Sequence, residues 1–161
     1  MSGFRRSLLA ALAGGVLTLA QAPVGAWPAL VLGGAALLWL IGQAPTPRAG
    51  AWTGWAAGTG YFATGLFWIV EPFFVDAARH GWMAPFALVF MAGGLALFWA
   101  VAGWAARRVA PGPGFWGALG FAVTLTLVEY ARAHVLTGFP WALLAYGWIG
   151  AAPAQVLALI G

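Results

Sequence analysis

Five long apolar runs divide this chain, and they constrain its fold more than any other feature. Only 6% of the 161 residues are charged, whereas a soluble domain carries roughly 25% charged residues. A surface so poor in charge faces lipid, and each run approaches the ~20 residues that a helix needs to cross ~30 Å of hydrocarbon. The predicted spans are Leu8–Gln21, Trp27–Ile41, Ala51–Val70, Met83–Trp104 and Phe115–Val135. The sequence therefore predicts an all-α fold, a polytopic transmembrane helix bundle.

Turn-forming residues separate the predicted spans. The breaks are Ala22-Pro23-Val24-Gly25, Pro45-Thr46-Pro47, Glu71-Pro72 and Pro111-Gly112-Pro113-Gly114. The first run, preceded by Arg5-Arg6 and followed by Val24-Gly25-Ala26, also fits a cleaved signal peptide. We favour a retained first span, because a second apolar run begins at once at Trp27.

The charged residues indicate how the chain is oriented. If the spans alternate in direction, five arginines fall on one side, namely Arg5, Arg6, Arg48, Arg107 and Arg108. The positive-inside rule then predicts a cytoplasmic N-terminus. The other side receives Arg79, Arg132 and all three acidic residues, Glu71, Asp76 and Glu129. The basic residues form no continuous stripe, so nucleic acid is not a predicted partner.

The last residues resemble the start of a sixth span. Pro153 suits the first turn of a helix that runs inward, but only nine residues remain, which reach about 13 Å. We therefore expect residues 1–161 to be a fragment, an N-terminal membrane domain with five spans and a truncated sixth. The alternative is that Ala142–Gly161 lies along the membrane interface, because Gly147, Gly150 and Pro153 interrupt it.

Two stretches of the third span and its exit stand out. Gly50, Gly54 and Gly58 recur every four residues, which predicts a helix-packing seam rather than a lipid-contacting groove. Anchoring in a belt of aromatic residues at the membrane interface does not readily explain Trp68. Beyond it, Pro72 is expected to end the helix, and the i,i+3 spacing of Asp76 and Arg79 permits an ion pair on a short helical turn, the alternative being a solvated loop.

Glu129 and Arg132 are the best polar candidates for a site. Glu129 lies about 21 Å along the fifth span, near the outer edge of the hydrocarbon, where a charge normally finds a partner. Arg132 at i+3 is the obvious partner, and His134 is a further candidate for the same network. The pair is either a structural bridge within the bundle or a polar wall beneath an outer-face site, and the residues alone leave both readings open.

The stretch Val135–Trp141 predicts a rigid exit from the fifth span. Gly138 permits unusual backbone angles, and Pro140 blocks continuation of the helix. Phe139 and Trp141 offer an aromatic surface at headgroup depth. Such a loop either holds lipid or anchors the fold.

The chain offers little for catalysis. It contains no Cys and no Lys, which removes a thiol nucleophile and a lysine base. Its two histidines, His80 and His134, have no metal-ligand spacing, so neither a metal nor another cofactor is predicted. We identify no catalytic residue.

Several motifs together resemble one family. Glu129-Tyr130-Ala131-Arg132, followed by Leu136-Thr137-Gly138-Phe139-Pro140-Trp141, is similar to a signature of bacterial apolipoprotein N-acyltransferases. Three further landmarks agree in order and spacing: Ala22–Pro28, Gly65–Val70 and Gly81–Pro85. The sequence departs from the family at Ile69-Val70-Glu71-Pro72, where members often continue with Val-Tyr and a polar run, so any role of that Tyr does not transfer.

The resemblance implies a function that this chain performs only in part. Such enzymes reside in the bacterial inner membrane and transfer an acyl chain from a phospholipid donor to the N-terminal amine of a diacylated apolipoprotein acceptor. The reaction passes through a Cys thioester in a periplasmic nitrilase-like domain, which residues 1–161 lack. This part is expected to seat lipid and to anchor that domain, with substrate-binding candidates Trp68, Glu129, Arg132, Thr137, Gly138, Phe139, Pro140 and Trp141. The alternative is a small non-catalytic multi-pass scaffold or transporter subunit.

Overall fold

The computed structural model describes residues 1–135, 138–152 and 154–156, and no β-strand occurs among them. The all-α prediction is therefore confirmed for this part of the chain. The elements are the α-helices α1 (Gly3–Thr18), α2 (Trp27–Gly42), α3 (Pro47–Gly65), α4 (Ala77–His80), α5 (Ala84–Val109) and α6 (Phe115–His134), and the 3₁₀ helices η1 (Phe67–Phe74), η2 (Gly81–Met83) and η3 (Leu144–Trp148).

Helices form at all five predicted spans, but they differ in length and hydropathy. Within the described residues, one continuous helical segment, Ala77–Val109, is long and apolar enough to cross a membrane, with a mean hydropathy of 2.1. Trp27–Gly42 is a shorter apolar helix. The five-span membrane bundle thus remains a prediction. Pro153, on which the predicted sixth span depends, and residues 157–161 lie outside the described residues.

The exit from the third helix differs from the prediction. The α-helix ends at Gly65, and Leu66 leaves the helical region with φ −113° and ψ 20°. The chain then continues as η1, which contains Pro72, so the prediction that Pro72 ends the helix is wrong. The break comes earlier because glycine is a weak helix former and Leu66 no longer has helical backbone angles.

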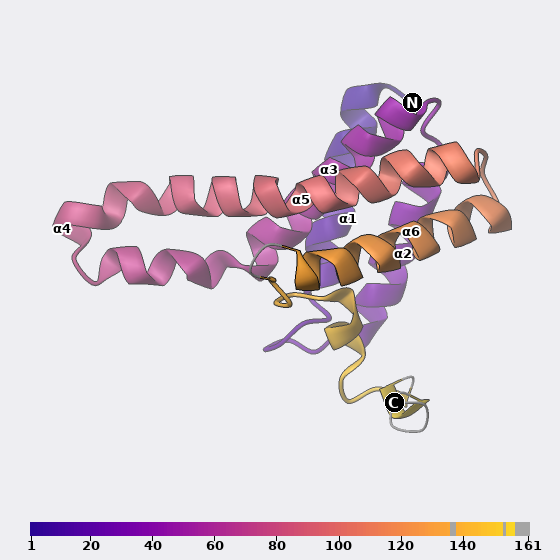
Figure 1. Ribbon diagram of the computed structural model, residues 1–161. Helices are drawn as coiled ribbons and strands as arrows, with labels where there is room; N and C mark the ends of the chain where they lie inside the picture. Colours follow the sequence, from indigo (N-terminus) through magenta and orange to yellow (C-terminus); the bar gives the residue numbers. More distant parts are fainter. Residues whose placement is uncertain (136–137, 153, 157–161) are drawn as a thin grey trace.

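The segment expected to be a loop is also helical. A turn forms at α4, as the Asp76–Arg79 spacing predicts, and the Arg79 N–H donates to the Asp76 carbonyl at 3.2 Å. The two side chains do not pair, since the salt bridge found among the described residues joins Glu129 and Arg132. Residues 67–90, which we call the arm, extend away from α1 and α2 to a tip at α4 (Figure 1). Large apolar side chains along the arm are exposed, including Val75 at 91% and Phe90 at 74%.

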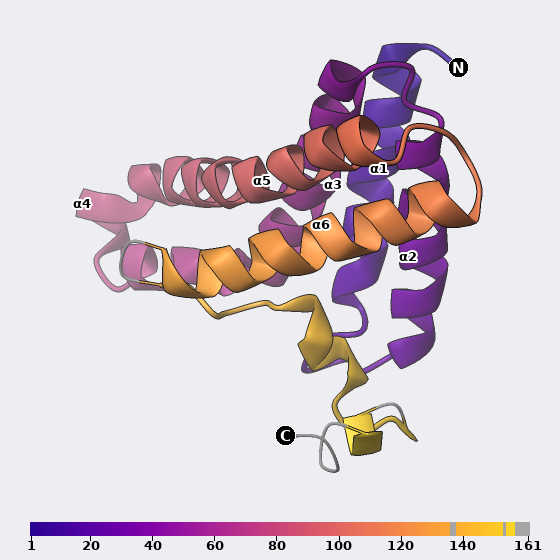
Figure 2. The same ribbon diagram turned by 45° about the vertical axis from the view of Figure 1, so that its right-hand side comes forward.

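Contacts between helices establish their relative directions. Helices α1 and α3 run parallel, because Arg6 contacts Thr53 and Thr18 contacts Thr64 further along both helices. Helix α5 runs antiparallel to α3, and α6 lies side by side with α5 (Figure 2). The start of α1, the start of α3 and the end of α5 therefore meet at one end of the molecule. This arginine-rich end carries Arg5, Arg6, Arg48, Arg107 and Arg108.

The predicted glycine seam is confirmed, and it places α3 at the centre of the fold. A Cβ at Gly54 would overlap the backbone carbonyl of Trp99, and one at Gly50 would overlap that of Gly103. On the other side of α3, a Cβ at Gly60 would overlap the backbone of Ala11 in α1. Backbones approach this closely only where side chains are absent.

We expect Gly54→Ala to lower the free energy of unfolding of the full-length gene product by about 1–3 kcal/mol, because the added methyl group forces α3 and α5 apart. Gly94→Ala is the matched control, since nothing lies within 4 Å of a Cβ at that helical position. Thermal unfolding in detergent measures both variants. Equal stability of the two variants would show that the glycine at position 54 is not needed for the close packing of α3 against α5.

Candidate functional site

The predicted ion pair lies buried near the end of α6. The Arg132 Nη2 atom is 3.2 Å from Glu129 Oε1. Arg132 is 1% exposed and Glu129 is 9% exposed. The i,i+3 spacing therefore predicted the pair correctly, and its burial means that protein groups have to satisfy both charges.

Glu129 connects three parts of the chain. Besides the bond from Arg132, its Oε1 accepts a hydrogen bond from the Trp99 indole N–H on α5 at 3.0 Å. Its Oε2 accepts from the backbone N–H of Leu144 at 3.1 Å. The carboxylate thus joins α5, α6 and the start of η3.

Arg132 organises the segment that follows its own helix. Its Nη1 donates to the carbonyls of Phe139 at 2.8 Å and Trp141 at 2.9 Å, and its Nη2 donates to the carbonyl of Ala142 at 3.3 Å. We call residues 138–143 the exit loop. Gly138 begins it with φ +73°, and a Cβ there would press on the carbonyl of Ala133, so the sequence requires glycine at this position.

An aromatic cluster supports the ion pair from α3 and α5. The Arg132 guanidinium lies 5.1 Å from the centre of the Phe62 ring, and Tyr61 stacks on Trp99 at 5.1 Å. The Gln21 amide donates to the Tyr61 hydroxyl at 2.8 Å and to the Leu143 carbonyl at 3.1 Å. This second connection joins the end of α1 to the exit loop.

These supporting residues were not among those predicted from the sequence to form the site. Trp99 offered a signal, because it falls in mid-span rather than at an interface. Gln21 offered another, as an uncharged hydrogen-bonding residue at the end of an apolar run. Neither signal identifies the partner, since Trp99 and Glu129 are thirty positions apart in the chain.

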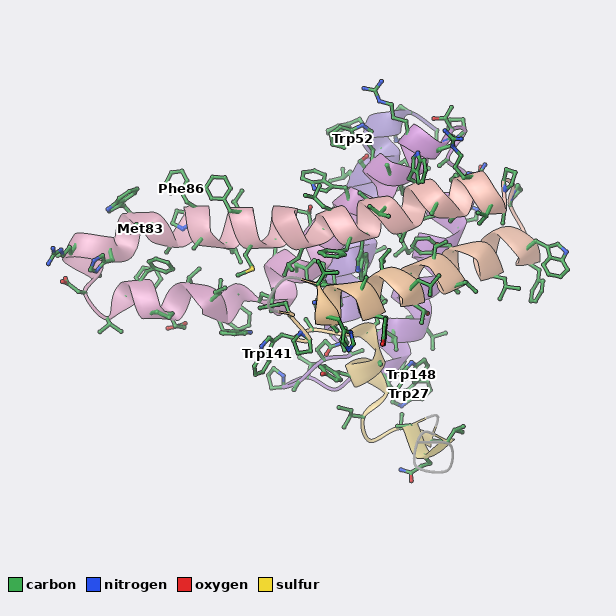
Figure 3. All side chains as sticks on the ribbon, viewed as in Figure 1. Trp27, Trp52, Met83, Phe86, Trp141 and Trp148 are labelled. Atoms are coloured by element: carbon green, nitrogen blue, oxygen red, sulfur yellow. The ribbon has the colours of Figure 1, made fainter. Side chains whose placement is uncertain are left out.

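The other predicted residues divide into exposed and packed positions. Trp141 is 60% exposed and Trp68 is 46% exposed, and their rings meet edge to face with centroids 6.3 Å apart. Pro140 is exposed, whereas Phe139 is partly buried against the core, so the predicted aromatic surface consists of Trp141 with Trp68 rather than with Phe139. Figure 3 shows that Trp141 lies far from Trp52, which is at the other end of the molecule. Thr137 lies outside the described residues.

His134 does not join the Glu129 network. Its Nδ1 lies 2.8 Å from the carbonyl oxygen of Tyr130, and the two rings are 4.3 Å apart. Both residues line a groove of about 370 Å³ between α6 and residues 143–145, together with Leu125, Glu129 and Leu144. The described residues contain no group of three or more His, Cys, Asp or Glu placed to hold a metal ion.

Arg132→Ala should destabilise the full-length gene product by about 3–5 kcal/mol, because Glu129 would keep its buried charge without its cation. Arg108→Ala is the control, since Arg108 is exposed and contacts the ring of Trp104. Thermal unfolding and the yield of folded protein in detergent report the loss. Matching stability in the two variants would show that the pair holds nothing in place.

The fold and site define an apolar, all-α domain in which a buried ion pair fixes an aromatic loop at the end of a helix. The family model described as the apolipoprotein N-acyltransferase N-terminal domain matches residues 13–161. The chain belongs to this family.

Individual relatives carry the same name. An apolipoprotein N-acyltransferase from Caulobacter vibrioides is 48% identical over 157 residues, covering 95% of this chain and 29% of the relative. One from Rhodopseudomonas palustris is 41% identical, covering 99% of this chain and 31% of the relative. One from Rhizobium rhizogenes is 38% identical, covering 90% of this chain and 29% of the relative. The chain thus spans about three tenths of the length of these curated relatives.

Proposed function

We propose that this chain is the membrane-embedded N-terminal part of an apolipoprotein N-acyltransferase of the bacterial inner membrane. The complete enzyme would transfer an acyl chain from a phospholipid to the N-terminal amine of a diacylated lipoprotein. The chain has neither Cys nor Lys, so a Cys thioester has to form on another segment. The named relatives are more than three times as long as the aligned region, which leaves room for a separate catalytic domain that we propose to be nitrilase-like.

The role of this part would be to seat lipid and to anchor the catalytic domain. The observation that carries this proposal is the exit loop, whose carbonyls accept three hydrogen bonds from one buried guanidinium. A loop held in this way presents the exposed Trp141 and its neighbour Trp68 in a fixed position. A preorganised aromatic surface loses little conformational entropy when an acyl chain or headgroup binds.

Glu129 and Arg132 would then be positioning residues. The carboxylate already accepts from Trp99, Arg132 and Leu144, and the guanidinium already donates to the exit loop. The two carboxylate oxygens and the two Nη atoms are engaged within the protein, and Arg132 Nε is buried without a hydrogen-bond partner. The engaged atoms favour a bracing role over direct contact with substrate. The groove between α6 and residues 143–145 would accept the acyl chain, with Leu125, Leu144 and Ala145 as apolar lining and Glu129 at its wall.

The orientation follows from the charges. Five arginines gather at one end of the bundle, and the acidic residues lie elsewhere, with Glu71 and Asp76 on the arm. The positive-inside rule then favours an arginine-rich end in the cytoplasm. The exit loop would face the periplasm, where the catalytic domain is proposed to lie.

The gene itself distinguishes this proposal from a small scaffold or transporter subunit. We expect the reading frame beyond codon 161 to encode further spans and a Cys-containing nitrilase-like domain. The full-length product should then restore lipoprotein N-acylation in a bacterium depleted of its own enzyme. A stop codon with no such domain encoded nearby would contradict the proposal.

Trp141→Ala in the full-length gene product should raise the apparent KM for phospholipid by about fivefold or more and leave folding intact, because an exposed aromatic contact of about 1 kcal/mol is lost. Trp116→Ala is the matched control, an exposed tryptophan at the opposite end of α6. Acyl transfer to a diacylated lipopeptide at varied phospholipid concentration separates KM from kcat. The same KM in both variants would remove Trp141 from the lipid site.

A further inference from the structure

A second polar site lies at the arginine-rich end, far from the exit loop. The first turns of α1 and α3 border an open pocket of about 290 Å³, lined by Gly3, Arg6, Ser7, Thr46, Arg48, Ala49 and Trp52. Two of these residues are arginines, and the three acidic residues of the chain are Glu71, Asp76 and Glu129. The pocket therefore has two cations and no carboxylate in its lining.

Arg6 is the unusual member of this pocket. It is 7% exposed, although a buried guanidinium is costly unless it is paired. Its Nε donates to the Thr53 hydroxyl at 2.9 Å, and that hydroxyl donates onward to the Ala49 carbonyl at 2.8 Å. The described residues provide no hydrogen-bond acceptor for its two Nη atoms. These two atoms are not among the fully buried unpartnered atoms, so they remain accessible from the pocket, where Nη2 lies beside Gly3.

The helix ends add to the positive potential. Both α1 and α3 begin at this pocket, and the first turn of a helix carries a partial positive charge. Ser2 and Thr46 cap the two helices by accepting from the backbone N–H groups of Arg5 and Ala49. A buried arginine, an exposed arginine and two helix N-termini thus converge on one volume, which matches the chemistry of a phosphate group.

Trp52 indicates where that phosphate would come from. It lines the pocket, is 54% exposed, and lies at the end of the molecule near the N-terminus (Figure 3). An exposed tryptophan at a helix end is typical of headgroup depth in a bilayer. The positive-inside rule accounts for an exposed arginine such as Arg5. It gives no reason for Arg6 to be buried.

We propose that this pocket binds the phosphate of an anionic phospholipid from the leaflet that surrounds the arginine-rich end. Arg6 receives the phosphate oxygens on its two Nη atoms, and Arg48 closes the pocket from the rim. The lipid acts here as a structural ligand that neutralises a buried cation and ties α1 to α3. This site is separate from the proposed acyl-donor site at the exit loop.

The test compares arginines at the same end of the full-length gene product. Delipidated protein in detergent is titrated with phosphatidylglycerol and, separately, with zwitterionic phosphatidylcholine, and bound lipid is counted by native mass spectrometry. Wild-type protein should prefer phosphatidylglycerol, and Arg6→Gln and Arg48→Gln should each weaken that binding by about fivefold. Arg5→Gln should change it by less than about twofold, because Arg5 is exposed and outside the pocket.

The Arg48 and Arg5 variants decide the proposal even if Arg6→Gln fails to fold, because both positions are exposed. If Arg48→Gln and Arg5→Gln weaken phosphatidylglycerol binding equally, the lipid is attracted by the overall positive charge of this end and not by the pocket, which would overturn the proposed site. Equal binding of the two lipids by wild-type protein would overturn it as well. Displacement of phosphatidylglycerol by millimolar inorganic phosphate would assign the pocket to a free anion instead of a lipid.

Discussion

The buried pair of Glu129 and Arg132 is the interaction on which the exit-loop end of this structure depends. Two charges removed from solvent need protein groups to supply most of their hydrogen bonds. Here the acceptors and donors come from α5, from α6 and from the exit loop. Glu129 and the two Nη atoms of Arg132 therefore have their hydrogen bonds only when all three elements are in place, while Arg132 Nε is buried without a partner. The position of the exit loop is thus a consequence of the packing of the helices.

Helix α3 connects that pair to the rest of the molecule. Its glycines let α1 and α5 approach on opposite sides, and this central place gives it a role at both ends. Near its C-terminal end it supplies Tyr61 and Phe62 beneath the ion pair. Near its N-terminal end it supplies Thr53 to Arg6. Two polar sites in an apolar chain thus share one tightly packed helix.

Local patterns predicted the helices and the centre of the site, and long-range contacts account for what they missed. Apolar runs bounded by proline and glycine placed the helices within a few residues, and the i,i+3 spacing identified Glu129 with Arg132. The same reasoning could not find Trp99, Gln21 or the Leu144 N–H, because these partners are brought to the pair by tertiary packing. It also misplaced the end of the third helix, where the backbone of Leu66 rather than Pro72 ends the α-helix.

The central claim is that the ion pair holds the exit loop in one position, and amide hydrogen exchange tests it directly. In the full-length gene product, the Leu144 amide donates to Glu129 and the Phe139 amide donates to the carbonyl of Arg132. If the ion pair holds the loop, both amides exchange as slowly as those in the last turns of α6. Exchange at the rate of an unstructured peptide, with α6 still protected, would contradict it.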